Sequence, residues 1–241
     1  MKKTTWLTEW KIAHRGLHSE TIPENSQAAF RAAIDRGYAI ELDVQPSLEG
    51  TPMVFHDAHL SRMTGLDAYI YHTLESDLLK TALQATDEMI PSLKNVLEFV
   101  HGQVPLLIEI KADAPVVSLT NAVIELLDDY EGDVAVHSFS PKIVRHLKKK
   151  APHLLRGQIS SDFKTAQTMS KFRKVYLSRM LLNPLTQPDF ITYDIRALPT
   201  PYVRRFKAKG KIALGYTAKN KKAYDEALKS VDNAVFEGFL L

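Results

Sequence analysis

The sequence predicts an α/β protein, and within that class a (β/α)8 barrel. Short apolar runs rich in β-branched residues alternate along the chain with helix-like stretches, a pattern typical of parallel strands joined by crossover helices. Eight such runs fit within 241 residues, close to the roughly 250 residues of a typical barrel. The runs cover residues 11–14, 38–44, 105–110, 134–138, 154–159, 190–193, 211–216 and 234–239. We therefore expect one barrel domain over residues 1–241.

A further apolar run, Pro52–His56, does not fit the alternation. It follows the second run after only the short link "QPSLEG", whereas a parallel crossover needs about a dozen residues. We therefore expect it to return antiparallel, outside the barrel. Residues 45–104 would then form a small insertion between strand 2 and strand 3, above the carboxyl ends of the strands, where barrel active sites lie.

The first crossover helix is predicted from the stretch "SQAAFRAAIDRG". Its apolar residues recur at helical spacing, and Gly37 follows as a stop. Asn25 and Ser26 are both candidates for the N-cap, because both residue types are favoured there.

Composition and motifs exclude several functional classes. The chain has no cysteine, which excludes disulfides, thiolate metal sites and a cysteine nucleophile. It also lacks a serine nucleophile elbow, a Walker loop and a dinucleotide fingerprint. The two N-terminal lysines precede no apolar segment, and no run approaches the roughly 18 apolar residues of a spanning helix. We expect a cytoplasmic protein without a transmembrane segment.

Charge is distributed unevenly along the chain. Residues 1–140 hold 10 Lys and Arg against 21 Asp and Glu, whereas residues 141–241 hold 21 against 7. Solvated helix faces are the ordinary explanation for such charge runs. The alternative is a field that attracts an anionic small-molecule substrate or gives weak contact with a membrane surface. No motif or aromatic platform indicates nucleic acid, and the oligomeric state is left open.

Carboxylates gather at two strand ends. In "AIELDV", Glu41 and Asp43 share one face of the strand, about 7 Å apart. In "LLIEIK", Glu109 and Lys111 do the same. Glu41, Asp43 and Glu109 form an all-oxygen set that suits Mg²⁺, Ca²⁺ or Mn²⁺. The alternative is a set of ordinary salt bridges from Lys111 to Glu109 or Glu41.

Two histidines also end strands. His14 ends the first run and His56 ends the returning hairpin. Imidazole titrates near neutrality, which suits a general base and a general acid. Arg15 and Lys111 add the positive charge that a phosphate oxyanion needs. Four other histidines have no comparable setting, and we expect them to be surface or insertion residues: His18, His59, His72 and His101.

Five motifs in order and spacing resemble the glycerophosphodiester phosphodiesterase family. They are "AHRG", "PENSQAAF", "ELDVQ", "VFHD" and "IEIK", with a weaker continuation in "VHSF". The match is close from about Ile12 to Lys111. It implies a TIM barrel with a small insertion after strand 2, and a metal-dependent hydrolysis of glycerophosphodiesters to sn-glycerol 3-phosphate and an alcohol.

The resemblance also implies roles for individual residues. His14 and His56 would be the acid/base pair, with His14 the base by analogy. Glu41, Asp43 and Glu109 would hold one divalent cation, Mg²⁺, Ca²⁺ or Mn²⁺. Three residues would bind the substrate: Arg15 at the phosphate, with Lys111 and Asn25. The attacking group is water or the substrate's own glycerol hydroxyl.

Some roles stay open within the resemblance. Asn25 belongs to the family's Glu-Asn pair, formed here with Glu24, or does no more than cap the helix. Asp57 orients His56 or faces solvent.

The C-terminal half departs from the family pattern. Tyr216 stands where a tryptophan is common, and "VFEGFLL" replaces a "T-D-x-P" ending followed by a helix. These changes leave the identity of the substrate's alcohol part open. They also leave open what covers the side of the barrel where the family has its final helix; the N-terminal segment with Trp6 and Trp10 is the candidate cover. The alternatives are a lysophospholipase D or related phospholipid phosphodiesterase or lyase, and a non-catalytic binding protein on the same scaffold.

Overall fold

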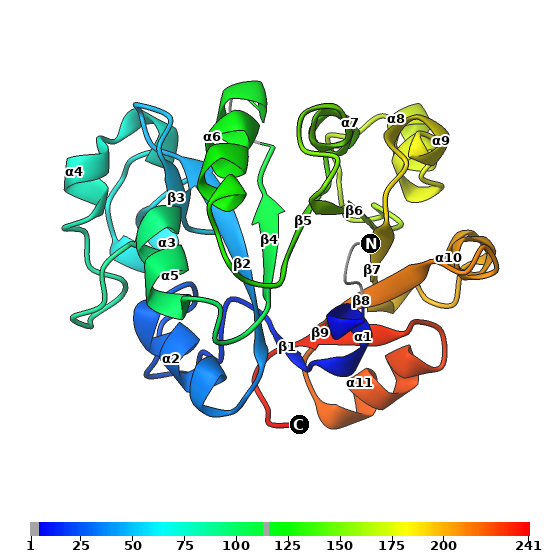
Figure 1. The fold of residues 1–241 in the computed structure, drawn as a ribbon, viewed down its shortest axis with the longest axis horizontal. Helices are drawn as coiled ribbons and strands as arrows, with labels where there is room; N and C mark the ends of the chain where they lie inside the picture. The colour runs from blue at the N-terminus through cyan, green and yellow to red at the C-terminus, as the bar shows by residue number, and fades with distance from the viewer. Residues whose placement is uncertain (1–4, 113–115) are drawn as a thin grey trace.

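Eight parallel strands close into a barrel in the computed structural model, which describes residues 5–112 and 116–241. Each strand pairs with its neighbours in parallel, and β1 closes the ring because it pairs with both β2 and β9 (Figure 1). The predicted (β/α)8 fold is confirmed. The barrel strands are β1 Ile12–Ala13, β2 Ala39–Pro46, β4 Leu106–Ile110, β5 Val134–Ser138, β6 Leu155–Ser160, β7 Phe190–Asp194, β8 Ile212–Ala218 and β9 Asn233–Phe236.

The ninth strand, β3, lies outside the ring. Its residues Pro52–Val54 pair antiparallel with the end of β2, as the short link predicts. The insertion continues through α3 (Ser61–Thr64), a 3₁₀ turn (Ile70–His72) and α4 (Glu75–Leu78), whose apolar residues form a small core of their own. The crossover helix that returns the chain to the barrel is α5 (Leu93–Val100), which packs against β3 and the neighbouring helices.

Helices surround the barrel in Figure 1. In chain order they are α2 Gln27–Asp35, α5, α6 Val116–Asp128, α7 Pro141–Lys150, α8 Lys171–Ser178, α9 Asn183–Thr186, α10 Pro201–Lys207 and α11 Lys221–Leu228. A short 3₁₀ turn, Ile195–Ala197, follows β7. Within the described residues no helix is long and apolar enough to cross a bilayer.

The first crossover helix begins at Ser26. The Ser26 hydroxyl accepts a hydrogen bond from the Ala29 amide at 3.1 Å, so Ser26 and not Asn25 is the N-cap. Gly37 follows the helix with a left-handed φ of +63°, the conformation that glycine adopts without strain.

Strand alternation separates the two faces of the sheet. On β2, Ile40, Leu42 and Val44 belong to the core between the barrel and the helices. The intervening residues, Glu41 and Asp43 among them, therefore point into the barrel. This places the two carboxylates on the inner face, as the pattern predicts.

The amino end of the barrel is filled by an apolar layer. Trp6 and Leu7 of α1 (Trp6–Glu9) pack against one inward side chain from each barrel strand, and Figure 1 shows α1 in front of the ring. The layer comprises Ile12, Ala39, Leu107, Ala135, Leu155, Phe190, Leu214 and Val235. Because this end is apolar and closed, the polar chemistry is confined to the carboxyl end.

The outer side of the last strand is covered differently from our expectation. Strand β9 ends at Phe236, three residues before the predicted end, and the chain turns at Gly238 with φ +78°. The Phe239 ring then lies against Phe236 at 5.4 Å between centroids, and the Tyr38 hydroxyl donates to the Leu241 carbonyl at 2.6 Å. The C-terminal tail covers this side. The candidate cover, the N-terminal segment with Trp6 and Trp10, is divided: Trp6 lies inside the amino end, whereas Trp10 also packs against the core between the barrel and the helices.

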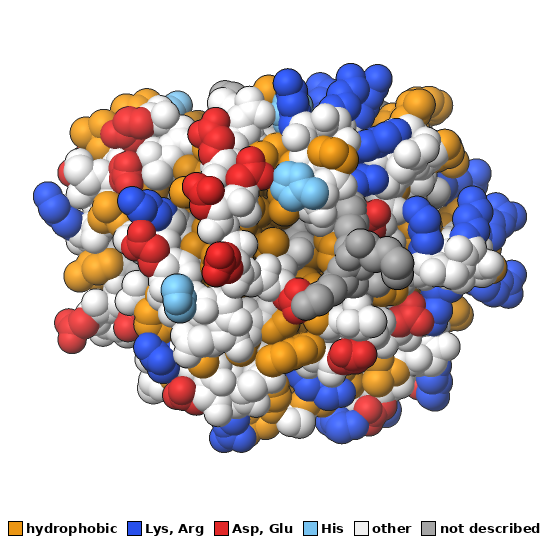
Figure 2. Space-filling view, viewed as in Figure 1, with side chains coloured by type: hydrophobic (Ala, Val, Ile, Leu, Met, Phe, Trp, Pro, Cys, Tyr) orange, Lys and Arg blue, Asp and Glu red, His pale blue; other side chains and the backbone are white. Residues whose placement is uncertain are grey.

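The charge asymmetry of the sequence becomes an asymmetry of the surface. In Figure 2, Lys and Arg side chains gather over α7, α8 and α10, while Asp and Glu dominate over the insertion, α5 and α6. On the face that Figure 2 shows, the basic side chains are thus concentrated over the C-terminal helices and the acidic ones over the N-terminal half.

Candidate active site

Polar side chains from several strand ends meet at the carboxyl end of the barrel. Glu41 and Asp43 come from β2, and Glu109 and Lys111 from the end of β4. His14 and Arg15 directly follow β1. Register aligns Asp43 with Glu109 across the β2–β4 pair. The predicted residues from these strands are therefore brought together.

Asp43 is the most heavily paired carboxylate of the cluster. Its side chain is 1% exposed, with Arg15 Nε at 3.0 Å and Lys111 Nζ at 2.7 Å. The Asn25 amide donates to Asp43 Oδ2 at 3.0 Å. Burial alone would raise the pKa of Asp43, but the Lys111 and Arg15 charges outweigh it and hold that pKa well below the usual range. Asn25 is thus a partner of Asp43 and not a helix cap.

Lys111 joins two carboxylates. Its Nζ lies 2.7 Å from Asp43 Oδ1 and 2.8 Å from Glu109 Oε1. Burial opposes its charged form, yet the Asp43 and Glu109 carboxylates raise the pKa of Lys111. The salt bridge from Lys111 to Glu109, one of the two alternatives from the sequence, is therefore present; the second bridge goes to Asp43 and not to Glu41.

His14 lies between two carboxylates. Its Nδ1 contacts Glu237 directly, and its Nε2 lies 3.9 Å from Glu41 Oε2. The same Glu41 oxygen accepts the Arg15 backbone amide at 3.1 Å. Burial disfavours the imidazolium, but Glu41 and Glu237 outweigh burial and raise the pKa of His14.

His56 belongs to a chain of ion pairs that reaches Arg15. The His56 Nδ1 lies 2.5 Å from Asp57 Oδ1, and Arg62 Nε contacts the other Asp57 oxygen at 2.5 Å. Arg62 Nη2 continues to Glu24 at 2.6 Å, and Glu24 pairs with Arg15 Nη1 at 2.7 Å. Asp57 therefore orients His56, which answers the question left open by the sequence.

Three side chains are placed to hold a cation. Glu41, Glu109 and His137 each offer a ligand atom within 4.8 Å of the others, and all three are buried. His137 Nε2 is a buried nitrogen with no hydrogen-bond partner among the described residues. Two carboxylates and an unpaired imidazole nitrogen fit a divalent cation. Asp43 is instead engaged by three donors, so its role as a ligand stays a prediction.

Residues 14–236 match the Glycerophosphoryl diester phosphodiesterase family. The chain belongs to this family. A Glycerophosphodiester phosphodiesterase of Caldanaerobacter subterraneus subsp. tengcongensis is 34% identical over 158 residues, which cover 61% of this chain and 64% of that protein. A Lysophospholipase D of Rattus norvegicus is 34% identical over 143 residues, covering 54% of this chain and 44% of that protein. The matched region is thus less than two thirds of the length of either relative.

Solved structures match over nearly the whole chain. An Oleispira antarctica phosphodiesterase in complex with the product sn-glycerol-3-phosphate has a TM-score of 0.79 and 26% identity, covering 95% of this chain and 92% of that chain. A glycerophosphodiester phosphodiesterase of Thermotoga maritima has a TM-score of 0.73 and 24% identity, covering 93% of this chain and 92% of that chain. Because its identity is low, this structure supports the fold alone. The C-terminal departures from the family motifs therefore leave the barrel intact.

Tyr216 lies on an aromatic wall of the site. Its hydroxyl donates to the Ser160 carbonyl at 3.2 Å, and its ring meets the edge of Phe139 at 5.9 Å between centroids. Phe163 continues the wall at 6.3 Å from Phe139. Burial, with smaller contributions from the Asp194 and Glu109 carboxylates, raises the pKa of Tyr216, so its hydroxyl stays protonated at neutral pH.

Sequence reasoning missed several members of this site. His137 stands beside Glu109 across the β4–β5 pair, and its inward parity on the strand was an available signal. Glu237 follows the last strand, the same kind of position that indicated His14. Arg62 comes from the insertion, where no period or strand end marks it. His18, predicted to be a surface or insertion residue, is partly exposed, but its Nε2 also lies 3.7 Å from Glu237, the carboxylate that contacts His14.

Proposed function

We propose that this chain hydrolyses glycerophosphodiesters to sn-glycerol 3-phosphate and an alcohol. The observation that carries the proposal is the pair of histidines, each with Nδ1 against its own carboxylate, beside a buried group of carboxylates, Arg15 and Lys111. Family membership and the product in the Oleispira antarctica structure support the same substrate class.

Fixed positive charge accounts for phosphate recognition. Burial disfavours a charged guanidinium, but the Asp43 and Glu24 carboxylates raise the pKa of Arg15. In the same way, the Asp43 and Glu109 carboxylates raise the pKa of Lys111 against the effect of burial. Both side chains are therefore cationic at neutral pH and oppose the extra negative charge of the transition state. A divalent cation held by Glu41 and Glu109, with Asp43 as a further predicted ligand, would supply additional charge stabilisation there.

Proton transfer is assigned to the two histidines. A carboxylate on Nδ1 fixes the imidazole so that Nε2 is the atom that takes or gives the proton, as in other histidine general bases. Glu237 does this for His14 and Asp57 for His56. His14 takes the proton of the attacking hydroxyl, and His56 gives one to the leaving oxygen. The attacking hydroxyl belongs to water or to the substrate's glycerol, which would react through a cyclic phosphate.

Alanine substitution tests these roles. His14→Ala and His56→Ala should each lower kcat for glycerophosphocholine by at least about 10²-fold, the scale of general acid–base catalysis. His153→Ala is the matched control, because this exposed histidine precedes β6 at the opposite end of the barrel and should leave kcat unchanged. Near-full activity in either active-site variant contradicts the assignment.

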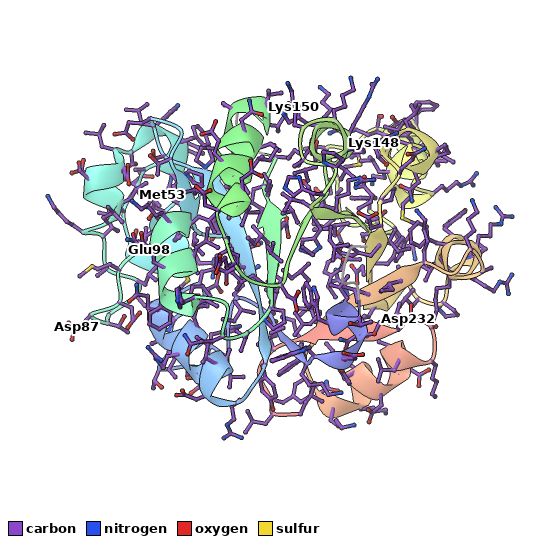
Figure 3. All side chains as sticks on the ribbon, viewed as in Figure 1. Met53, Asp87, Glu98, Lys148, Lys150 and Asp232 are labelled. Atoms are coloured by element: carbon purple, nitrogen blue, oxygen red, sulfur yellow. The ribbon has the colours of Figure 1, made fainter. Side chains whose placement is uncertain are left out.

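A second candidate substrate is a lipid-linked diester, such as a lysophospholipid. Helix α8 favours it, because none of its described side chains is buried and Phe172 is 81% exposed. Phe172 stacks with Tyr176, and basic residues flank it. Figure 3 labels Lys148 and Lys150 on the neighbouring helix α7. An exposed aromatic face among cations is typical of helices that bind anionic membrane surfaces.

The position of α8 links that surface to the site. The Leu177 carbonyl of α8 accepts the Ser160 hydroxyl at 2.9 Å, and the Ser160 carbonyl accepts the Tyr216 hydroxyl. Sedimentation with phosphatidylglycerol-containing vesicles, compared with pure phosphatidylcholine, tests the candidate. Binding that Phe172→Ser abolishes, together with release of lysophosphatidic acid and the head-group alcohol from lysophospholipids, would favour it; no binding and no release would exclude it.

A further inference from the structure

The imidazole of His137 has one satisfied and one unsatisfied nitrogen. Its side chain is 3% exposed. Nδ1 lies 3.1 Å from Thr192 Oγ1 on β7, whereas Nε2 has no hydrogen-bond partner among the residues that the structure describes. The nearest carboxylate oxygen is Glu41 Oε1 at 3.9 Å. That separation is too long for a hydrogen bond.

The two tautomers of His137 lead to the same requirement. With the proton on Nε2, a buried N–H would point at a carboxylate that it does not reach. With the proton on Nδ1, donated to Thr192, the Nε2 lone pair faces the Glu41 oxygen with no donor between them. Either arrangement leaves a buried polar atom unpaired, which costs roughly 1–3 kcal/mol. A cation between Nε2 and the carboxylates removes the cost in the second tautomer.

The distances suit a shared ion. Two ligands at about 2.1–2.3 Å from one cation can be at most about 4.5 Å apart, and His137 Nε2 and Glu41 Oε1 are 3.9 Å apart. A metal-bound histidine ordinarily donates its other N–H to a neighbouring oxygen. Thr192 Oγ1 is in that position.

The barrel wall makes room for this side chain. Gly157 on β6 pairs in register with His137, and a Cβ at Gly157 would lie 2.9 Å from the His137 Cβ and 2.4 Å from the Phe190 ring. Any larger residue there would push the imidazole or Phe190 aside. On the other side, Glu109 pairs in register with His137. The His137 imidazole is thus held beside Glu109, one of the two carboxylates with which it would bind the same ion.

We propose that His137 Nε2 is a direct ligand of the divalent cation held by Glu41 and Glu109, and that this nitrogen makes the chain prefer Mn²⁺ over Mg²⁺ and Ca²⁺. Mn²⁺ also accepts oxygen ligands, but as a first-row transition ion it binds an imidazole nitrogen more readily than Mg²⁺ and Ca²⁺ do, because those two ions select oxygen. The proposal rests on the cation site of the proposed function but not on the reaction, so it can fail while the hydrolysis stands.

Pulsed electron paramagnetic resonance on the Mn²⁺-loaded chain, without substrate, is the first test. A directly bound ¹⁴N gives a modulation in the wild type, and His137→Gln should abolish it. The matched control is His14→Gln, because His14 Nε2 lies at the same 3.9 Å from the other Glu41 oxygen; this variant should keep the modulation. Loss of the modulation in His14→Gln and its retention in His137→Gln would overturn the proposal.

Calorimetric titration with MnCl₂ and MgCl₂ is the second test. The wild type should bind Mn²⁺ at least about 10-fold more tightly than Mg²⁺, and His137→Gln should lower the Mn²⁺ affinity about 10–100-fold, with a smaller effect on Mg²⁺. His137→Asn serves as a second variant if His137→Gln does not fold. Equal affinities in wild type and variant, or no Mn²⁺ binding, would overturn the proposal, while a glycerophosphodiester assay run separately reports on the reaction itself.

Discussion

At the scale of single residues, the two candidate catalytic histidines are held in the same way from unrelated parts of the chain. Glu237 follows the last barrel strand and contacts His14 Nδ1, while Asp57 follows the hairpin and contacts His56 Nδ1. Each carboxylate has a cation of its own, Lys219 for Glu237 and Arg62 for Asp57. Both imidazoles are therefore oriented by carboxylates on Nδ1, which leaves Nε2 of each for the proposed proton transfer.

Glu237→Gln tests the positioning of His14. Glu237 and Glu41 raise the pKa of His14 against the effect of burial, so removal of the Glu237 charge lowers that pKa. A general base works only when it is deprotonated, so the acidic limb of the kcat/KM profile should move to lower pH, while kcat falls because the ring is less well oriented. The profile of Glu20→Gln, an exposed carboxylate in the β1–α2 loop that also carries His14, should match wild type. An acidic limb that stays in place or moves to higher pH contradicts the role.

Residues on strands with a clear inner face were predictable from the sequence. Alternation alone put Glu41 with Asp43, and Glu109 with Lys111, on one side of a strand. The Lys111–Glu109 salt bridge was one of the alternatives from the sequence. The second bridge, from Lys111 to Asp43, was not predictable, because it depends on the folded register of β2 and β4. Arg62 and Glu237 were not predicted as site residues, because their partners Glu24 and His14 are distant in sequence and neither residue lies on a segment with helical or strand periodicity.

At the scale of elements, the loop from β1 to α2 carries four residues of the site, which are His14, Arg15, Glu24 and Asn25. Arg15 and Asn25 both have left-handed backbone conformations, with φ of +55° and +56°. Gly16 follows with φ +77°, and a Cβ there would lie 2.8 Å from the Ala29 backbone. The glycine thus lets the loop lie directly on α2, which explains why a strand that ends in two polar residues is followed by glycine.

A pair of glycine substitutions separates this close approach from backbone strain. Gly16→Ala and Gly37→Ala both force alanine into a left-handed conformation, which costs about 1–2 kcal/mol. A Cβ at Gly37 has nothing within 4 Å, so only Gly16→Ala adds a clash. Urea unfolding should show Gly16→Ala less stable by at least about 1 kcal/mol than Gly37→Ala. Equal stabilities would show that the contact with Ala29 relaxes without cost.

Element ends were less predictable than the elements themselves. The alternation of strands and helices, and the antiparallel hairpin, could be predicted because each depends on residues that are close together in the sequence. The end of β9 could not be predicted in this way. The run "AVFEGF" looks like one strand in the sequence, but in the structure Phe236 is the last strand residue and Phe239 folds back onto it. The same turn brings Glu237 to His14.

At the scale of the whole molecule, the barrel has an apolar end and a polar end. α1 closes the apolar end with Trp6, which is 2% exposed, and the ionisable groups of the site lie at the other. The strand count predicted the barrel, but nothing in the sequence indicated that its first residues would fill the amino end, since that contact depends on closure of the ring.

Trp6→Ala tests how much this closure contributes. Removal of a buried tryptophan side chain should lower the free energy of unfolding by about 3–5 kcal/mol, measured by urea denaturation. Trp10→Ala is the control, because Trp10 is only partly buried, and it should cost clearly less. The fraction of Trp6→Ala protein that remains folded should keep the wild-type kcat, because Trp6 lies at the end of the barrel opposite to the site. A Trp6→Ala variant with the same free energy of unfolding as wild type would contradict the role of α1.

The central claim is a cation-assisted hydrolysis at the carboxyl end of the barrel. The most direct measurement is release of sn-glycerol 3-phosphate from glycerophosphocholine, glycerophosphoethanolamine and glycerophosphoglycerol by the purified chain, with Mg²⁺, Ca²⁺, Mn²⁺ or EDTA. We expect release that EDTA abolishes, that a divalent cation restores, and that Glu41→Gln lowers with every cation. Release that is indifferent to EDTA, or none from any of the three diesters under any condition, would contradict the account.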